Sequence, residues 1–163
     1  MHFHDAQEAE KHLNAVEQLG CVVKKSQHGD HIDVRYHCQE WKSMTLENAE
    51  AAKQWNDWLV SAGFDVFSPR VDAAFSSGEA AVQFRLAEFK SLHGDGSAEQ
   101  NQFVETLKKV GCDVRVTEHG NHSDIRFRAP TWCKICVADE AAANQWVEWF
   151  KTQGFEAKVG EAD

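Results

Sequence analysis

The sequence predicts an α+β protein, a tandem duplication of an α-β-β-β-α-β module, in which each antiparallel sheet is covered on one face by two helices. Three observations predict this class. The chain aligns with itself at an offset of 91 residues, each aligned half holds two stretches with helical spacing of apolar residues, and segments of alternating polarity lie between them. Of the 163 residues, 42% are apolar and 26% are charged, which is typical of a globular protein.

The internal repeat pairs residues 5–67 with residues 96–158 without a gap. Seventeen of the 63 aligned positions are identical, about 27%, and three tryptophan pairs stay in register. A module of about 65 residues is near the lower size limit for independent folding, so we expect the two modules to pack on each other. The expected organisation is a first module over 1–70, a connector over 71–95 and a second module over 96–163.

Each module is expected to open with a helix. Asp5 and Glu8 in the first module, and Ser97 and Gln100 in the second, have the spacing of an N-cap residue and its partner in the first turn. Apolar residues then recur at helical spacing until Gly20 or Gly111 ends the helix.

Two alternating segments follow and are expected to form a β-hairpin. The dipeptides Gly29-Asp30 and Gly120-Asn121 have the composition of two-residue hairpin turns. This turn fixes the register of the hairpin and places its polar side chains on the face opposite the apolar set. In the first module the expected cross-strand pairs are His28 with His31, Ser26 with Asp33 and Lys24 with Arg35.

The rest of each module is expected to hold a third strand, a second helix and a last strand. The third strand is expected over 41–46 and over 132–137, the latter after a turn that contains Pro130. The second helix begins near Asn48 or Asp139, and a last strand follows over 64–67 or 155–159. The helix tryptophans share a stripe with apolar neighbours and are predicted to pack in the core: Trp55, Trp58, Trp146 and Trp149.

The connector over 71–95 has no counterpart ahead of the first module. Val82, Phe84 and Leu86 alternate with polar residues, which favours an extra strand over a helix in this segment.

The hairpin face away from the helices is the candidate binding surface. It carries histidine, aspartate and arginine at matching positions of both modules, and a tryptophan of the third strand has the parity to join it. Arginine offers a planar fork for carboxylate or phosphate, and tryptophan offers a stacking plane. The candidate ligand-binding residues are His28, His31, Asp33, Arg35, Trp41, His119, His122, Asp124, Arg126 and Trp132.

The net charge of the chain narrows the classes of partner that we expect. The chain has 17 Lys and Arg against 26 Asp and Glu, a net charge of -9, which does not favour nucleic acid as a partner. We therefore expect a non-enzymatic binding or regulatory protein that takes a small anion or a protein partner on this face, without a cofactor. Two alternatives stay open: a histidine-dependent hydrolase acting on RNA, and a metal-binding module built on the two His-x-x-His pairs.

The order of helix, three strands and helix resembles the double-stranded RNA-binding fold and the small toxin ribonucleases of the HicA type. The residues follow neither pattern. The second helix opens without a lysine cluster, and Asp30 and Asn121 precede His31 and His122 where the toxins have serine.

The N-terminal residues and the cysteines predict the compartment. The segment 1–5 has neither a basic region nor an apolar run, so it does not have the features of a signal peptide. No apolar stretch approaches the roughly 20 residues of a membrane span. Together with an odd number of cysteines, five, this predicts reduced thiols and a cytoplasmic protein.

Overall fold

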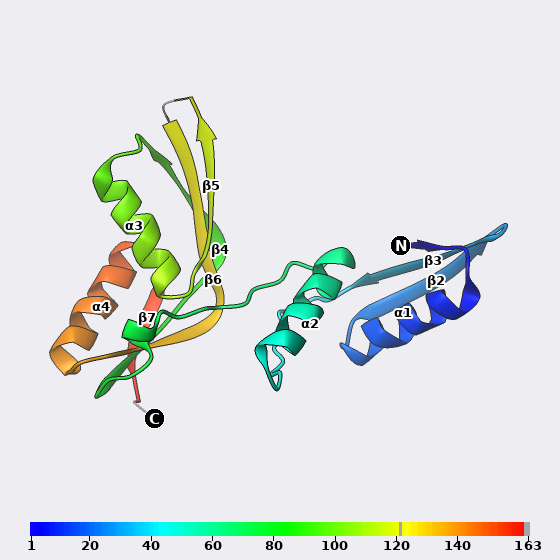
Figure 1. Ribbon diagram of the computed structural model, residues 1–163, viewed down its shortest axis with the longest axis horizontal. Coiled ribbons are helices and arrows are strands. Elements are labelled where there is room, and N and C mark those ends of the chain that lie inside the picture. Colours follow the sequence, from blue (N-terminus) through cyan, green and yellow to red (C-terminus); the bar gives the residue numbers. More distant parts are fainter. Residues whose placement is uncertain (121, 162–163) are drawn as a thin grey trace. The chain divides into compact units, whose positions relative to one another are not determined.

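The computed structural model describes residues 1–120 and 122–161, in two compact units that we call unit 1 (Met1–Val66) and unit 2 (Phe67–Asp163) (Figure 1). Within the described residues lie four α-helices and two antiparallel sheets of three and four strands, so the predicted α+β class is confirmed. None of the helices in this part of the chain is both long and apolar enough to cross a bilayer.

Unit 1 is a three-stranded sheet with one helix packed on it. Its elements are β1 (His2–Phe3), α1 (Ala6–Gln18), β2 (Val22–His28), β3 (His31–His37) and α2 (Ala49–Ser61), and the strand order is β1-β3-β2. The Asp5 carboxylate starts α1 by accepting hydrogen bonds from the N–H groups of Gln7 and Glu8. α1 buries Ala9 against Ile32 and Val34 of β3, so the core of this unit is small.

The predicted third and last strands of unit 1 are wrong. Residues 41–46 and 64–67 belong to no helix or strand. The physical reason is that a strand needs a neighbouring strand to pair its backbone N–H and C=O groups. The only further strand among the described residues of unit 1, β1, is short and pairs only with Ile32 and Asp33 of β3. The prediction of a second covering helix is also wrong here. α2 buries none of its residues and meets the rest of the unit through Trp58, beside His12, and through the Ala62 carbonyl, which accepts from Tyr36 Oη.

Unit 2 is a four-stranded sheet with the order β5-β6-β4-β7, and α3 and α4 lie on the same face of it (Figure 1). Its elements are the 3-10 turn η1 (Ala73–Phe75), β4 (Ala80–Gly94), α3 (Ala98–Lys109), β5 (Asp113–His119), β6 (His122–Val137), α4 (Glu140–Thr152) and β7 (Glu156–Gly160). The segment expected as a connector with a possible extra strand thus contains β4, which pairs with both β6 and β7.

β6 joins two segments that the sequence separates by a turn, so the predicted turn at Pro130 is wrong. β4 pairs with both halves of β6 and holds them as one 16-residue strand. Between the pairs Leu86↔Ala129 and Phe84↔Cys133, β6 advances four residues while β4 advances two, so β6 bulges there. Pro130 lies in this bulge, where a residue without an N–H is tolerated.

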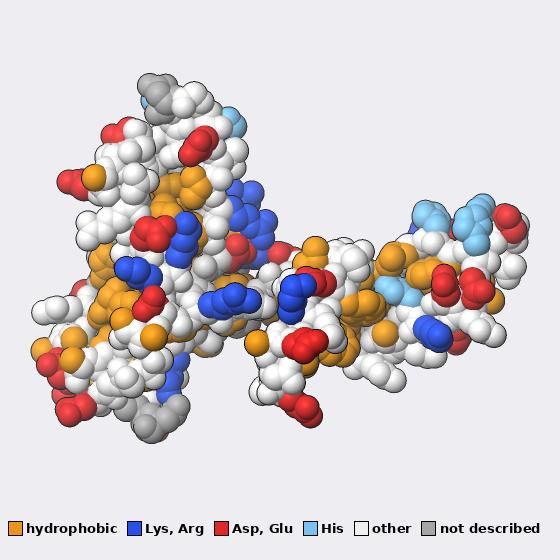
Figure 2. All heavy atoms as spheres, viewed as in Figure 1, with side chains coloured by type: hydrophobic (Ala, Val, Ile, Leu, Met, Phe, Trp, Pro, Cys, Tyr) orange, Lys and Arg blue, Asp and Glu red, His pale blue; other side chains and the backbone are white. Residues whose placement is uncertain are grey.

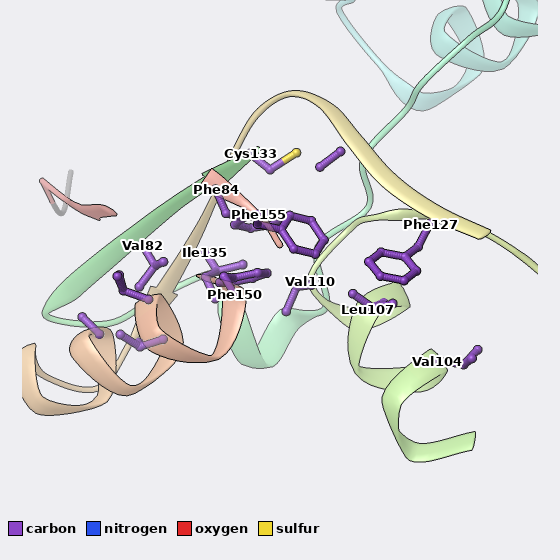
Figure 3. Packing of buried hydrophobic residues seen from close by; sticks show 14 of the residues in the cluster. Val82, Phe84, Val104, Leu107, Val110, Phe127, Cys133, Ile135, Phe150 and Phe155 are labelled. Atoms are coloured by element: carbon purple, nitrogen blue, oxygen red, sulfur yellow. The ribbon is translucent and has the colours of Figure 1, made fainter. Parts of the chain in front are cut away.

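The core of unit 2 lies between its sheet and its two helices (Figure 3). Phe84 of β4 and Phe150 of α4 are fully buried and stack with their ring centroids 4.0 Å apart. Trp146 and Trp149 are partly buried and pack against this cluster, as predicted. In unit 1 the prediction of a core position is wrong for Trp55, which is 38% exposed.

Two of the five cysteines form a disulfide, Cys21–Cys38, which joins the start of β2 to the end of β3. The expectation of reduced thiols is therefore wrong for this pair, while Cys112, Cys133 and Cys136 are free. The five cysteines therefore divide into one disulfide pair in unit 1 and three free thiols in unit 2.

Candidate functional site

The two hairpins have the register that their turns predict. In unit 1, Lys24 lies opposite Arg35, Ser26 opposite Asp33 and His28 opposite His31. In unit 2 the corresponding pairs are Arg115 with Arg126, Thr117 with Asp124 and His119 with His122. Since the alternate positions of these strands pack against the helices, the paired polar residues lie on the open face of each sheet.

Each open face holds one carboxylate between two histidines. In unit 1, Asp33 Oδ1 lies 2.5 Å from His2 Nδ1, and Asp33 Oδ2 lies 3.9 Å from His28 Nε2. In unit 2, Asp124 Oδ1 lies 2.8 Å from His93 Nδ1, and Asp124 Oδ2 lies 3.6 Å from His119 Nε2. The hydrogen bond with His93 is the main cause of the lowered pKa of Asp124.

His2 and His93 were missed from the sequence. They stand 91 residues apart, the same offset that aligns the two hairpins, so an extension of the alignment toward the N-terminus finds them. His2 lies on β1, which pairs with β3, and His93 lies on β4, which pairs with β6.

Three arginines surround one phenylalanine on the open face of unit 2. The guanidinium carbons of Arg115, Arg126 and Arg128 lie 4.5, 4.7 and 4.1 Å from the centroid of the Phe89 ring. We call these four residues the arginine cluster. Asp113 accepts from Arg115 Nη2 at 3.1 Å and from Arg128 Nε at 3.2 Å. Arg126 has no ion pair among the described residues, so the cluster has more positive than negative charge.

Only Arg126 of the arginine cluster was among the candidate residues. Phe89 lies where β4 has a shift in register against β6, and its polar neighbours in the sequence give no regular alternation, so no signal marks it. Arg128 has the same parity as Arg126 on β6 and is 7% exposed. The polar face of the strand, continued by two residues from Arg126, predicts this position of Arg128 from the sequence.

Trp132 lies on the same sheet within reach of two further cations. Its ring centroid is 5.3 Å from the guanidinium carbon of Arg85 and 5.0 Å from Nζ of Lys158, and the residue is 44% exposed. Glu156 accepts from Arg85 Nη2 at 2.7 Å. Trp41, the corresponding candidate of unit 1, is 40% exposed and lies outside the strands of the sheet.

The open face of unit 2 therefore combines guanidinium donors with two aromatic rings, the half-buried Phe89 and the exposed Trp132. Figure 2 shows Lys and Arg side chains gathered beside β5 and β6, in a chain that is acidic as a whole. A hollow of about 340 Å³ lies elsewhere in the unit and is lined by residues such as Phe75, Lys134 and Cys136. None of the candidate ligand-binding residues lines this hollow.

Comparison with known proteins gives no relative. No protein family, curated protein or solved structure matches this chain.

Proposed function

We propose that this protein is a non-enzymatic binding protein that takes anionic groups, phosphate or carboxylate, on the open sheet face of unit 2. The ligand is a small anion or an acidic segment of a protein partner. The observation that carries the proposal is the arginine cluster, in which three guanidinium groups gather around Phe89 and Asp113 is the carboxylate partner of Arg115 and Arg128.

The chemistry of the arginine cluster favours an oxyanion. A guanidinium presents planar donors that can bind two oxygens of one carboxylate or phosphate, and it stays charged at every physiological pH. The Phe89 ring contacts all three guanidinium groups, and Asp113 accepts hydrogen bonds from Arg115 and Arg128. An incoming anion would relieve the repulsion between like charges, which favours binding at this point over the acidic remainder of the surface.

Trp132 extends the proposed site. Its exposed ring can stack on a planar group of the ligand, while Arg85 and Lys158 provide further positive charge. A ligand with both an anionic group and a flat ring would use both parts of the face. The candidates His119, His122 and Asp124 lie nearer the hairpin turn and would set the limit of the site.

We also propose that the two units descend from one duplicated module. The offset of 91 residues, the common hairpin register and the carboxylate between two histidines in each unit support this origin. The cytoplasmic location stays a prediction. The Cys21–Cys38 disulfide gives it a direct test, because such bonds are rare in reducing compartments.

Titration with phosphate and citrate tests the anion site. Chemical-shift mapping on the full chain should place the largest changes at Arg126 and its neighbours on β5 and β6. Arg126→Ala should weaken binding about tenfold or more, as expected for the loss of a charge-assisted contact worth about 1.5–3 kcal/mol.

The matched control is Lys108→Ala, which removes an exposed cation from α3 outside the sheet face. Equal weakening by both variants would show a general effect of charge and would refute the site. Binding that is unchanged in Arg126→Ala would refute it as well.

A further inference from the structure

We propose that unit 1 holds a second kind of site, which binds a divalent transition-metal ion through His4, Asp30 and His31. One donor atom from each of these side chains lies within 4.8 Å of the others. The site goes beyond the anion-binding function, because all three ligands belong to unit 1 and the arginine cluster belongs to unit 2.

The fold brings the three ligands together through two short connections. β1 pairs with β3 as His2↔Asp33 and Phe3↔Ile32, and the next step of this register sets His4 beside His31. The β2–β3 turn places Asp30 directly before His31, and Gly29 takes the positive φ of 64° that this turn requires. His31 begins β3, His4 directly follows β1 and Asp30 lies in the turn, so strand pairing and the short turn together bring the ligands close.

The distances suit one metal ion. His31 Nε2 lies 3.2 Å from Asp30 Oδ1, and the rings of His4 and His31 have centroids 4.3 Å apart. Ligand atoms around a tetrahedral ion with bonds of 2.0–2.1 Å lie about 3.4 Å from each other. The His31–Asp30 pair already has this separation, and rotation of exposed side chains can close the remaining distances.

The donor set selects the class of metal. Two imidazoles and one carboxylate are ligands of Zn²⁺ and other first-row transition metals, whereas Mg²⁺ and Ca²⁺ prefer oxygen ligands alone. Three protein ligands leave a fourth position for water or an anion. Figure 2 shows several histidine side chains of unit 1 gathered at the end of the β2–β3 hairpin, on the protein surface where an ion can enter.

Neighbouring groups leave the three ligands available. His2 and His28 face Asp33, and the Asp5 carboxylate is engaged at the start of α1. His31 and Asp30 keep side-chain exposures of 46% and 85%. His4 meets His31 through a ring contact alone among the described residues.

Unit 2 supplies a matched comparison. His122 has the position of His31, but Asp95 stands where unit 1 has His4. The Asp95 carboxylate accepts from the Ser97 N–H at 3.0 Å. The described residues of unit 2 hold no group of three donors like that of unit 1.

Zinc titration of the full chain, without a histidine tag, tests the proposal. Calorimetry with ZnCl₂ near pH 7.5 should show one saturable equivalent. His4→Ala, Asp30→Asn and His31→Ala should each weaken binding at least about tenfold, whereas His122→Ala should leave the affinity unchanged. Binding should be lost near pH 5.5, since protonated imidazoles do not bind metal. The other titrating groups at this end of the unit are His2, His28, Asp5 and Asp33.

Three results would overturn the proposal: the absence of a saturable equivalent, unchanged affinity in His4→Ala or Asp30→Asn, or equal weakening in His122→Ala. All the ligands are at the surface, and His4→Gln is a second, polar replacement if His4→Ala lowers the helix content seen by circular dichroism. Arg126→Ala should bind zinc like the unmodified chain, which separates this test from that of anion binding.

Discussion

Loss of the Cys21–Cys38 disulfide is predicted to destabilise unit 1 strongly. The two cysteines are separated by 17 positions in the chain. Closing a loop of this length in the unfolded chain changes its entropy enough to account for about 3 kcal/mol at 25 °C. A unit of 66 residues has a free energy of unfolding of roughly 3–10 kcal/mol, so Cys38→Ala removes a large part of it. The small core around Ala9, Ile32 and Val34 contributes little further stability to offset this loss.

The assay is urea unfolding followed by NMR, because amide signals from β3 report unit 1 and signals from β6 report unit 2. Cys38→Ala, or treatment with a reducing agent, should lower the unfolding free energy read from β3. Cys136→Ala is the control, since Cys136 is a free thiol of unit 2. A loss below about 1 kcal/mol at β3 would refute the entropic argument. Three alkylated thiols in the denatured, unreduced chain would verify the partition of the cysteines.

Two further predictions concern the cores. Phe84→Ala should cost unit 2 about 3–5 kcal/mol in urea unfolding, because the ring is fully buried against Phe150, and a loss under about 1 kcal/mol would contradict that packing. Burial of His12 lowers its pKa below the ordinary 6.5, so the folded unit 1 binds fewer protons than the unfolded chain. Unit 1 should have its full free energy of unfolding above about pH 6.5 and lose part of it as the pH drops toward the lowered pKa of His12. The variant His12→Phe should reduce this dependence on pH. An unchanged slope of stability against pH in that variant would show that other groups cause the acid sensitivity.

Local features of the fold could be predicted from the sequence. The expected caps Asp5 and Ser97 accept hydrogen bonds from the first turns of their helices, and so do Asn48 and Asp139, near which the second helix of each module was expected to begin. The hairpin registers were also predicted, because a two-residue turn fixes every pair that follows it. Each of these features is determined by interactions between residues only a few positions apart in the sequence.

Pairing between distant segments could not be predicted. Alternation shows that a segment is able to form a strand, but the neighbour decides whether it does so. Residues 132–137 are part of β6 because β4 pairs with them, whereas residues 41–46 have no such neighbour in unit 1. Phe89 was missed for the same reason, since its place among three arginines follows from the register of β4 against β6.

The disulfide was predictable, although it was not predicted. The register that pairs His28 with His31 and Val22 with His37 places Cys21 opposite Cys38 one step further. The prediction of reduced thiols rested on the odd number of cysteines and did not use this register. In unit 2 the equivalent positions hold Cys112 and Ala129, so the same register offers no partner there.

The long strand β4 has a consequence for synthesis on the ribosome. β4 leaves the ribosome before β6 and well before β7, yet it pairs with both, from Gly94↔Ser123 to Ala81↔Gly160. Its apolar side chains must therefore wait for more than sixty residues to be added before the sheet can close. Unit 1 needs no such delay, because its strands and α1 lie within the first 37 residues. Unit 2 is thus the part of the nascent chain with the longer exposure to aggregation, and the part for which chaperone protection matters most.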